Sequence, residues 1–417
     1  MTRTVALVCL ILSTAVIAAA CGRDAQASRQ PAAETGLALN GDFSGSGPGT
    51  LHSANSLLTI DRRLSEITSI AARVEYTSSS GLSDDQTQVT GTVFAPKGKA
   101  PDGGWPVIAL GHAASGIQPD CAPSVSPSLL GLAPFVTLLV SAGYVVTLPD
   151  YQGLGNNRTY HPYLDSTTEG YNLIDAVRAA RKLVPDISDR WLAVGASQGG
   201  QAAFAANELA MNYGGGLKLV GSVSLAPPLD LTPLADAAAA GQLTTEQKEA
   251  LQSILASLKN EYPDFNLDDY RHGIVGDKWD LLSQCDIAGA DARSKVLDQV
   301  TDDDLRPSSP QAVTTLRAYL QKMSLPQGPT VAPMLVIYGG NDPFIPAGWT
   351  NRALAQACRL GDVIDIQFQP DKGNSDLDLA SADAWITARF NGEPADNSCQ
   401  PPPTTPTPTP ETGGDDG

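Results

Sequence analysis

Short apolar runs alternate along the chain with longer segments in which apolar residues recur every three or four positions. The first pattern predicts buried strands and the second predicts amphipathic helices. Strands are expected at 70–76, 88–94, 107–110, 144–148, 191–194, 219–225, 333–338 and 363–368, the first two as a pair, and helices at 134–142, 168–183, 201–210 and 376–390. Because strands and helices alternate, the sequence predicts an α/β fold with a mostly parallel, doubly wound sheet that is covered on both faces.

The alternation stops over residues 231–330, where the pattern is mostly helical. Residues 244–247 (TTEQ) form a helix-start signal, and an apolar-periodic run follows as far as Leu258. We therefore expect a helical cap or lid over 231–330, inserted between two parts of one core at 58–230 and 331–399. Caps of this kind control the access of substrate to a site beneath them.

Both ends of the chain differ from this core in composition. Residues 1–20 combine Arg3 with an apolar run and small residues, which is the pattern of a secretory signal peptide. The small residues before Cys21 also resemble a bacterial lipobox, which predicts a lipidated Cys21 at the cell surface, and plain secretion is the alternative. Residues 21–57 predict a flexible tether, and residues 400–417, rich in Pro and Thr, predict a disordered tail.

The overall composition narrows the classes of function. The chain has 417 residues, of which 42% are hydrophobic and 17% charged, and its formal net charge is −18. This composition is typical of a globular protein. The negative charge argues against nucleic acid as a partner and against electrostatic docking on anionic lipid, whereas a neutral substrate is compatible with it. The sequence does not indicate an oligomeric state.

The cysteines predict a disulfide-bonded, exported protein. Cys9 lies in the signal peptide and Cys21 is the candidate anchor. Four cysteines remain for the folded part: Cys121, Cys285, Cys358 and Cys399. An even number in an oxidising compartment predicts two disulfides, and four cysteines allow three pairings. We favour Cys121–Cys285 and Cys358–Cys399, of which the second closes the shorter loop. No Cys-x-x-Cys motif or histidine pair accompanies them, so no metal is expected, and no organic cofactor is implied.

The strongest chemical motif is a nucleophile elbow at residues 195–199 (GASQG). It directly follows the apolar run 191–194 and precedes the expected helix at 201–210. Strand, sharp turn and helix are the context in which Gly-x-Ser-x-Gly presents a catalytic serine. Gly195, Gly199 and Gly200 supply the small residues that such a strained turn needs. Ser197 is therefore the predicted nucleophile.

An elbow also needs donors for the negative charge that develops on the substrate oxygen. The backbone N–H of Gln198, at the start of the following helix, is the first predicted donor. The second should come from the loop at 111–116 (GHAASG), where Ala113 stands in place of the glycine that many esterases carry. Because alanine restricts φ, the donor geometry at Ala113 is less favourable than with glycine.

A serine hydrolase requires an acid and then a histidine, in that order along the chain. Asp342, in the stretch 338–343 (YGGNDP) just past a strand, is the predicted acid, because a carboxylate there would orient a histidine and stabilise its cation. Asp230 and Asp365 are weaker alternatives. No histidine follows Asp342, and the position expected for it is Asn374.

Asparagine cannot replace the base. Its amide can hydrogen-bond to Asp342, but it cannot take a proton from Ser197 because it is not basic at ordinary pH. Loss of the base removes most of the rate of a triad, although about 10³–10⁴-fold over water remains from the oxyanion hole and from binding. Two histidines are candidates for a substitute base: His112, whose loop faces the elbow, and His161.

Both candidates also fit an ordinary structural role as hydrogen-bonded loop histidines. The remaining histidines are His52, in the expected tether, and His272, in the expected cap. Neither is assigned a role.

Seven stretches together carry a resemblance to a known family. They are Gly111-His112; 120–124 (DCAPS); 150–155 (DYQGLG) with 161–163 (HPY); 176–181 (AVRAAR); the Ser197 elbow; 226–230 (APPLD); and 340–342 (GND). In these motifs the chain resembles the secretory lipase family of the α/β-hydrolases, the fungal lipase A type and its actinobacterial relatives. The resemblance spans about residues 60–395, nearly the whole folded part.

The resemblance implies a triacylglycerol lipase-like ester hydrolase with an α/β-hydrolase fold and a helical cap. It implies Ser197 as the nucleophile and Asp342 as the triad acid, and it supports the two disulfide pairings favoured above. The chain departs from the family at two places. The family histidine falls in a Gly-His stretch before the last helix, where this chain has Gly373-Asn374, and Ala113-Ala114 replaces the usual Gly-Thr of the oxyanion loop.

Three hypotheses follow from the sequence. The first is a secreted, membrane-tethered carboxylic-ester hydrolase that acts through a Ser197 acyl-enzyme, with weak or lost activity unless another histidine serves as base. The second is a non-catalytic lipid-binding lipoprotein that keeps the hydrolase scaffold. The third is an interaction protein of the cell envelope. The Ser197 elbow favours the first hypothesis and Asn374 favours the second.

Overall fold

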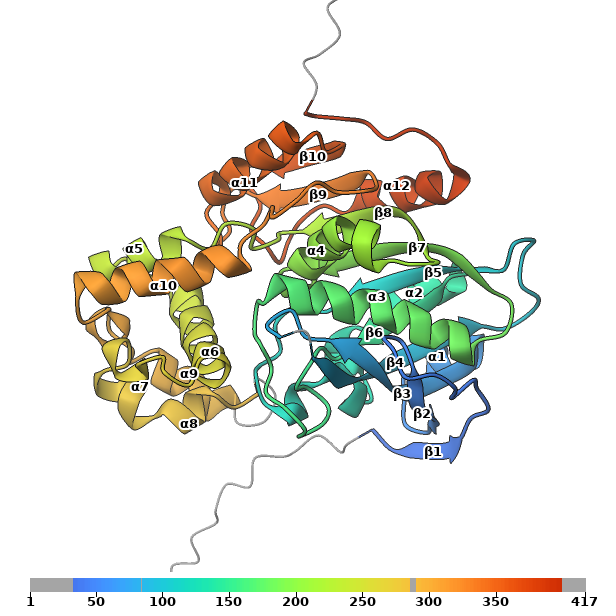
Figure 1. Ribbon diagram of the computed structural model, residues 1–417, viewed down its shortest axis with the longest axis horizontal. Helices are drawn as coiled ribbons and strands as arrows, with labels where there is room; N and C mark the ends of the chain where they lie inside the picture. The colour runs from blue at the N-terminus through green and yellow to red at the C-terminus, as the bar shows by residue number, and fades with distance from the viewer. Residues whose placement is uncertain (1–32, 84, 286–289, 400–417) are drawn as a thin grey trace, which may run out of the picture.

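One mixed β-sheet organises the core of the protein (Figure 1). The computed structural model describes residues 33–83, 85–285 and 290–399, so the expected signal peptide at 1–20, the Cys21 anchor and the tail at 400–417 lie outside the described residues. Across the described part, ten strands follow the spatial order β1-β2-β3-β4-β6-β5-β7-β8-β9-β10. Their bounds are β1 Thr35–Ala38, β2 Leu51–Leu57, β3 Thr68–Ser79, β4 Gln86–Pro96, β5 Trp105–Gly111, β6 Val145–Pro149, β7 Ile187–Ala196, β8 Lys218–Leu225, β9 Met334–Gly339 and β10 Ile364–Gln369.

The sheet has an antiparallel part and a parallel part. Strands β1 to β4 pair antiparallel in chain order, and β4 also pairs antiparallel with β6. From β6 onward, through β5, β7, β8, β9 and β10, all neighbours are parallel. In the register, Ile108 of β5 pairs with Val146 of β6 on one side and with Leu192 of β7 on the other. These central strands are apolar along their length because helices cover both of their faces.

Helices pack on both sides of this sheet. The helices of the core are α1 Arg62–Ile67, α2 Ala133–Ser141, α3 Ser166–Leu183, α4 Gln198–Tyr213, α11 Ala347–Leu360 and α12 Ala380–Asn391. On one face, Leu173 of α3 and Ala203 of α4 join the apolar core. On the opposite face, Val136 of α2 and Trp385 of α12 join a second one. The α/β fold with a doubly wound, mostly parallel sheet is therefore confirmed.

Local signals explain where these helices begin and end. The side chain of Asp165 caps α3 by accepting a hydrogen bond from the backbone N–H of Thr168 at 2.8 Å. Arg181 and Lys182 lie in the last turn of α3, where positive charge is favourable to the helix dipole. The last helix, α12, begins at Ala380 rather than at 376, because the carboxylate of Asp378 accepts from the N–H of Ala380 and holds a turn there.

The expected tether at 21–57 is wrong for the part that the structure describes. Strand β2 pairs antiparallel with β3, and β1 adds to its outer edge. Leu51 and Ala54 are buried in the core. The sequence does not predict β2 because the segment has few apolar residues. Its composition resembles a linker, and the pattern of inward-facing Leu51, Ala54 and Leu57 is weak. The folded core therefore begins before residue 58.

A second group of helices follows β8 and precedes β9 in the chain. Their bounds are α5 Pro233–Ala240, α6 Thr245–Glu261, α7 Gly273–Asp277, α8 Trp279–Leu282, α9 Ala290–Leu297 and α10 Pro310–Met323. They stand beside the sheet in Figure 1 and share an apolar core that includes Leu251, Ile254 and Leu316. Tyr163 and Phe344, from loops of the sheet domain, pack into the same cluster. The long helix α6 begins with a reciprocal capping box between Thr244 and Gln247, as the sequence predicts.

Two disulfides join distant segments, and both favoured pairings are confirmed. Cys121–Cys285 links the loop that follows β5 to the helical group, and Cys358–Cys399 links α11 to the segment after α12. In the described ranges, no helix has both the length and the apolarity needed to cross a bilayer.

Candidate active site

The turn between β7 and α4 has the geometry of a nucleophile elbow. Ser197 has φ 51° and ψ −120°, a backbone conformation that residues other than glycine rarely adopt. Its N–H donates to the carbonyl of Leu225 in β8 at 2.8 Å, which fixes the turn against the sheet. A Cβ atom on Gly195 would clash with the carbonyl of Gly199, and one on Gly199 would clash with the carbonyl of Gly111. These glycines therefore allow α4 to pack directly against the ends of β5 and β7.

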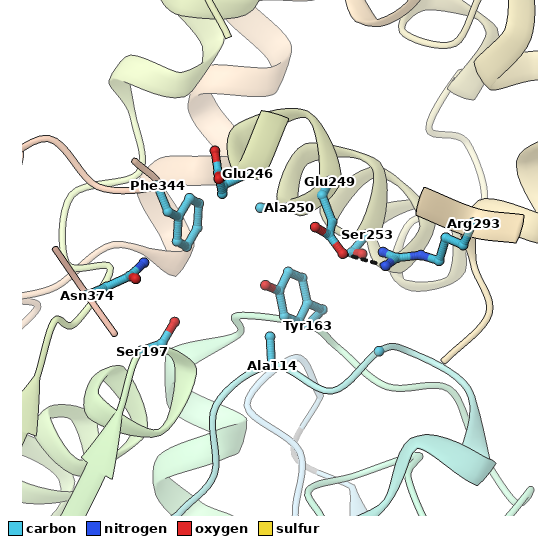
Figure 2. Close-up of a pocket in the computed structure, with 11 residues that line it drawn as sticks. Ala114, Tyr163, Ser197, Glu246, Glu249, Ala250, Ser253, Arg293, Phe344 and Asn374 are labelled. Atoms are coloured by element: carbon cyan, nitrogen blue, oxygen red, sulfur yellow. Dashed lines mark ion pairs between the residues drawn. The ribbon is translucent and has the colours of Figure 1, made fainter. Parts of the chain in front are cut away.

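The side chain of Ser197 faces a cavity between the sheet and the second group of helices, as Figure 2 shows. The cavity has a volume of about 210 Å³. It is lined by Ala114, Gly116, Tyr163, Ser197, Glu246, Glu249, Ala250, Ser253, Arg293, Phe344 and Asn374. Within the described residues, the Ser197 hydroxyl makes no hydrogen bond. The serine is thus presented to whatever occupies the cavity.

Asp342 lies next to Asn374, which lines the cavity together with Ser197. The Nδ2 amide of Asn374 donates to Oδ1 of Asp342 at 3.2 Å. The same oxygen accepts from the backbone N–H groups of Phe344 at 2.8 Å and Ile345 at 3.0 Å. Burial raises the pKa of Asp342, and these hydrogen bonds oppose that effect. Asn374 therefore bonds to the predicted acid and lines the same cavity as Ser197, but it offers the serine no basic nitrogen.

His112 is buried beneath the loop that follows β5. Its Nδ1 lies 2.7 Å from the carbonyl oxygen of Ala113, and its Nε2 lies 3.2 Å from the carbonyl oxygen of Asp150. The ring also packs against Tyr151, with centroids 4.4 Å apart. Burial lowers the pKa of His112. Both ring nitrogens are directed at carbonyl oxygens, so the imidazole has no lone pair turned toward Ser197 in this arrangement.

His161 is buried next to the side chain of Gln198. Its Nδ1 lies 2.9 Å from the carbonyl oxygen of Gln152, so Nδ1 carries the proton and Nε2 carries the lone pair. That lone pair accepts a hydrogen bond from the Gln198 side chain, with 3.0 Å between the two nitrogens. Burial lowers the pKa of His161 to about 3. The imidazole is therefore neutral and has both nitrogens occupied.

The two predicted oxyanion donors come from two segments, the start of α4 and the loop after β5. Gln198 is the first residue of α4, so its backbone N–H has no acceptor within that helix. In the loop after β5, Ala113 is exposed, and the residues of this loop that line the cavity are Ala114 and Gly116. Near the end of this loop, Gly116 packs closely against the disulfide, so that a Cβ atom there would clash with Sγ of Cys121. The position of Ala113 as the second donor stays a prediction.

The other candidates from the sequence make local contacts elsewhere. Asp230 forms an ion pair with Arg352 at 3.0 Å, and Asp365 accepts from the side chain of Gln367 at 3.3 Å. His52 hydrogen-bonds to the hydroxyl of Thr77. For His272 the partner is the carbonyl oxygen of Arg306, at 2.9 Å. Across the described ranges, no group of three or more His, Cys, Asp or Glu side chains is arranged to hold a metal ion.

Sequence reasoning missed the charged side of the cavity. Glu246 and Glu249 reach it from α6, and Arg293 reaches it from α9, where its Nη1 lies 2.5 Å from Oε1 of Glu249 (Figure 2). These residues read as ordinary polar positions of amphipathic helices. Tyr163 also lines the cavity. The one indication of its importance in the sequence is its place near His161, in one of the stretches that match the family.

Comparison with known proteins identifies the family to which this site belongs. The model of the secretory lipase family matches residues 132–398, more than half of the chain. The chain belongs to the secretory lipase family. This family is one of lipase- and esterase-like hydrolases. No curated protein matches the chain in sequence.

Solved structures give the same fold. Lipase A of Candida antarctica in its closed state superposes with a TM-score of 0.68 at 14% identity, covering 85% of each chain. The rice cell wall degrading esterase LipA of Xanthomonas oryzae superposes with a TM-score of 0.62 at 23% identity, covering 83% of this chain and 97% of the esterase. This secretory lipase family member therefore has an α/β-hydrolase fold. Family membership and the two disulfides together indicate an exported protein.

Proposed function

We propose that this protein is a secreted serine hydrolase of the lipase and carboxylesterase class, with Ser197 as its nucleophile and with a triad in which Asn374 replaces the histidine. The observation that carries the proposal is the position of Ser197. It has the backbone conformation of an elbow and shares one cavity with Asn374, which hydrogen-bonds to Asp342 at 3.2 Å. Family membership supports ester hydrolysis as the reaction class.

The proposed reaction follows from these residues. Ser197 Oγ attacks the ester carbonyl carbon, its proton leaves, and the carbonyl oxygen becomes an oxyanion that the N–H of Gln198 stabilises. Collapse expels the alcohol, which takes up a proton, and water then hydrolyses the acyl-serine. Each step needs a group that carries a proton between oxygens. Asn374 does not supply one, so we expect the natural chain to hydrolyse esters slowly.

The helices α5 to α10 have the role of a cap in this proposal. Two of them, α6 and α9, contribute part of the cavity wall. A cap in this position would select esters by size and exclude water from the acyl-serine. We also propose that the exported protein is tethered to the cell surface through a lipidated Cys21, which would keep it near lipid substrates.

A single set of assays tests this function. Hydrolysis of short-chain and long-chain nitrophenyl esters is measured for the natural chain, Ser197→Ala and Asn374→His. We expect slow hydrolysis by the natural chain, none above background by Ser197→Ala, and a gain of about 10²–10⁴-fold in kcat for Asn374→His, the usual contribution of a general base. A natural chain and an Asn374→His chain that are both inert, although folded, would falsify the proposal.

One observation favours a second candidate function. His112 and His161 both have their ring nitrogens occupied, and Asn374 donates to Asp342 rather than accepting from Ser197. A chain without any base fits a non-catalytic lipoprotein that uses the cavity to bind lipid. Tight binding of a lipid or fatty ester by a natural chain that hydrolyses none would establish this alternative, and mutation of His112 or His161 would then leave the chain equally inert.

A further inference from the structure

The residue that follows the nucleophile is held by a buried hydrogen-bond network. The Nε2 amide of Gln198 donates to Oε1 of Glu169 at 2.7 Å and to Nε2 of His161 at 3.0 Å. Gln198 is 1% exposed, and its two partners are 0% and 2% exposed. Both amide protons of Gln198 are thus used, and neither bond is exposed to competing water.

Each partner of Gln198 is itself fixed from a second direction. Oε1 of Glu169 also accepts from the backbone N–H of Leu164 at 3.0 Å. Nδ1 of His161 donates to the carbonyl of Gln152 at 2.9 Å. Glu169 comes from the first turn of α3, whereas His161 comes from the preceding loop. The side chain of Gln198 therefore sits between two anchored groups and has one position available.

Burial favours the neutral form of both partners of Gln198. Burial raises the pKa of the Glu169 carboxyl well above its usual range, and burial lowers that of His161 to about 3. Oε2 of Glu169 has no hydrogen-bond partner within the described part of the chain. The Gln198 amide thus donates to two acceptors that burial keeps neutral, and the network holds no buried charge.

The same loop connects this network to the cavity and to α6. The hydroxyl of Ser257 in α6 donates to the carbonyl of His161 at 2.8 Å and accepts from the backbone N–H of Tyr163 at 3.0 Å. Tyr163 lines the cavity beside Ser197 (Figure 2). The loop that carries His161 is therefore pinned by α6 on one side and by Gln198 on the other.

We propose that Glu169 and His161 are positioning residues, which clamp the Gln198 side chain so that its backbone N–H stays directed at the oxyanion formed at Ser197. The inference rests on the proposed function, since it assigns a task within that site. A donor that is fixed before the reaction stabilises the developing negative charge without having to reorient. A mobile donor loses part of that stabilisation. The amide of Gln198 suits this task because its NH2 group donates to both partners without adding a buried charge.

The test uses the full chain, both with its natural Asn374 and as Asn374→His. We expect Glu169→Leu to lower kcat by about 10–100-fold with little change in KM, less than the about 10²–10³-fold cost of losing an oxyanion donor outright. Glu169→Gln, which keeps the accepting oxygen and matches a protonated carboxyl, should retain at least tenfold more kcat than Glu169→Leu. Glu208→Leu, which removes a half-buried carboxyl farther along α4, is the control for a general loss of packing.

Gln198→Met gives a second, independent measurement in case Glu169→Leu folds poorly. It removes both donors while leaving Glu169 and His161 in place, and its kcat loss should equal that of Glu169→Leu. The double variant should lose no more than either single variant, because both remove the same clamp. Thermal unfolding of every variant separates loss of fold from loss of rate.

Three results would overturn the positioning role: unchanged kcat in both Glu169→Leu and Gln198→Met, equal damage by Glu169→Gln and Glu169→Leu, or additive losses in the double variant. An Asn374→His chain that is folded but inert overturns the proposed function, and with it the donor that the clamp would position. An active Asn374→His chain with any of the three results overturns the clamp alone.

Discussion

Individual residues at the elbow carry most of the information about chemistry. Ser197 and the glycines around it could be recognised from the sequence because the elbow is a local device, with strand, turn and helix contiguous in the chain. Its strained backbone at φ 51° depends on close packing that side chains would prevent. The sequence also identified Asn374 as the residue in place of a base, and the structure adds that its amide is bonded to Asp342.

The glycine at position 199 gives a direct test of that packing. Gly199→Ala should destabilise the protein by about 2–3 kcal/mol and weaken any Ser197 chemistry, because its new methyl group would overlap the carbonyl of Gly111. Urea unfolding and labelling by a serine-hydrolase probe measure the two effects. Gly215→Ala is the matched control, since nothing lies within 4 Å of its Cβ position. Equal stability of the two variants would show that the elbow has room to spare.

A half-buried carboxyl in α4, that of Glu208, predicts a pH dependence of stability. Burial raises the pKa of Glu208 from 4.5 to about 8, although its carboxylate accepts from the N–H of Gln327. Because the folded pKa lies above the unfolded one, this residue's contribution to stability is complete below pH 4.5 and is lost as the pH rises through about 8. Glu208→Gln should therefore lose less stability than the natural chain between pH 5 and pH 9.

Urea unfolding at pH 5, 7 and 9 measures this difference. Glu66→Gln is the control, because the Glu66 side chain is 60% exposed. The expectation is contradicted if the natural chain and Glu208→Gln show parallel pH profiles.

At the scale of elements, most strands and helices could be predicted because their apolar periodicity is strong. The exceptions have physical reasons. Strand β2 lies in a segment of small residues whose apolar pattern is weak. It forms because its backbone pairs with the edge of β3. The start of α12 is moved by an Asp378 turn that no periodicity shows. Helix α6 is the opposite case, since its TTEQ capping box is a local signal that the structure reproduces.

The capping box of α6 can be tested by one substitution. Thr244→Ala removes an acceptor for the N–H of Gln247 and a donor to the carbonyl of Pro343, so it should cost about 1 kcal/mol of unfolding free energy. Thr244→Ser should keep most of it. Thr245→Ala, an exposed change one residue later, is the control and should be nearly neutral. Chemical denaturation that ranks Thr245→Ala below Thr244→Ala would refute the role of the cap.

At the scale of the whole molecule, the N-terminal strands close the antiparallel side of the sheet. A chain that starts at residue 33 should be as stable as one that starts at residue 22. A chain that starts at residue 58 should lose about 3–6 kcal/mol, because it loses the buried side chains Leu51 and Leu57, and should aggregate through the uncovered edge of β3. Thermal unfolding and size-exclusion chromatography measure both effects. Full stability of the shortest chain would restore the tether as far as residue 57.

The sequence by itself determined the fold class and both disulfides, and it predicted the elbow serine, the acid and the missing base. These features are written in local periodicity, in contiguous motifs, or in the presence or absence of a residue type. Only the tertiary structure decided which groups surround the serine. The bond from Asn374 to Asp342, the clamp of Gln198 by Glu169 and His161, and the charged residues of α6 and α9 in the cavity wall all join segments far apart in the chain. Such contacts depend on how helices and loops pack around the sheet, and side-chain identity along the chain does not specify that packing.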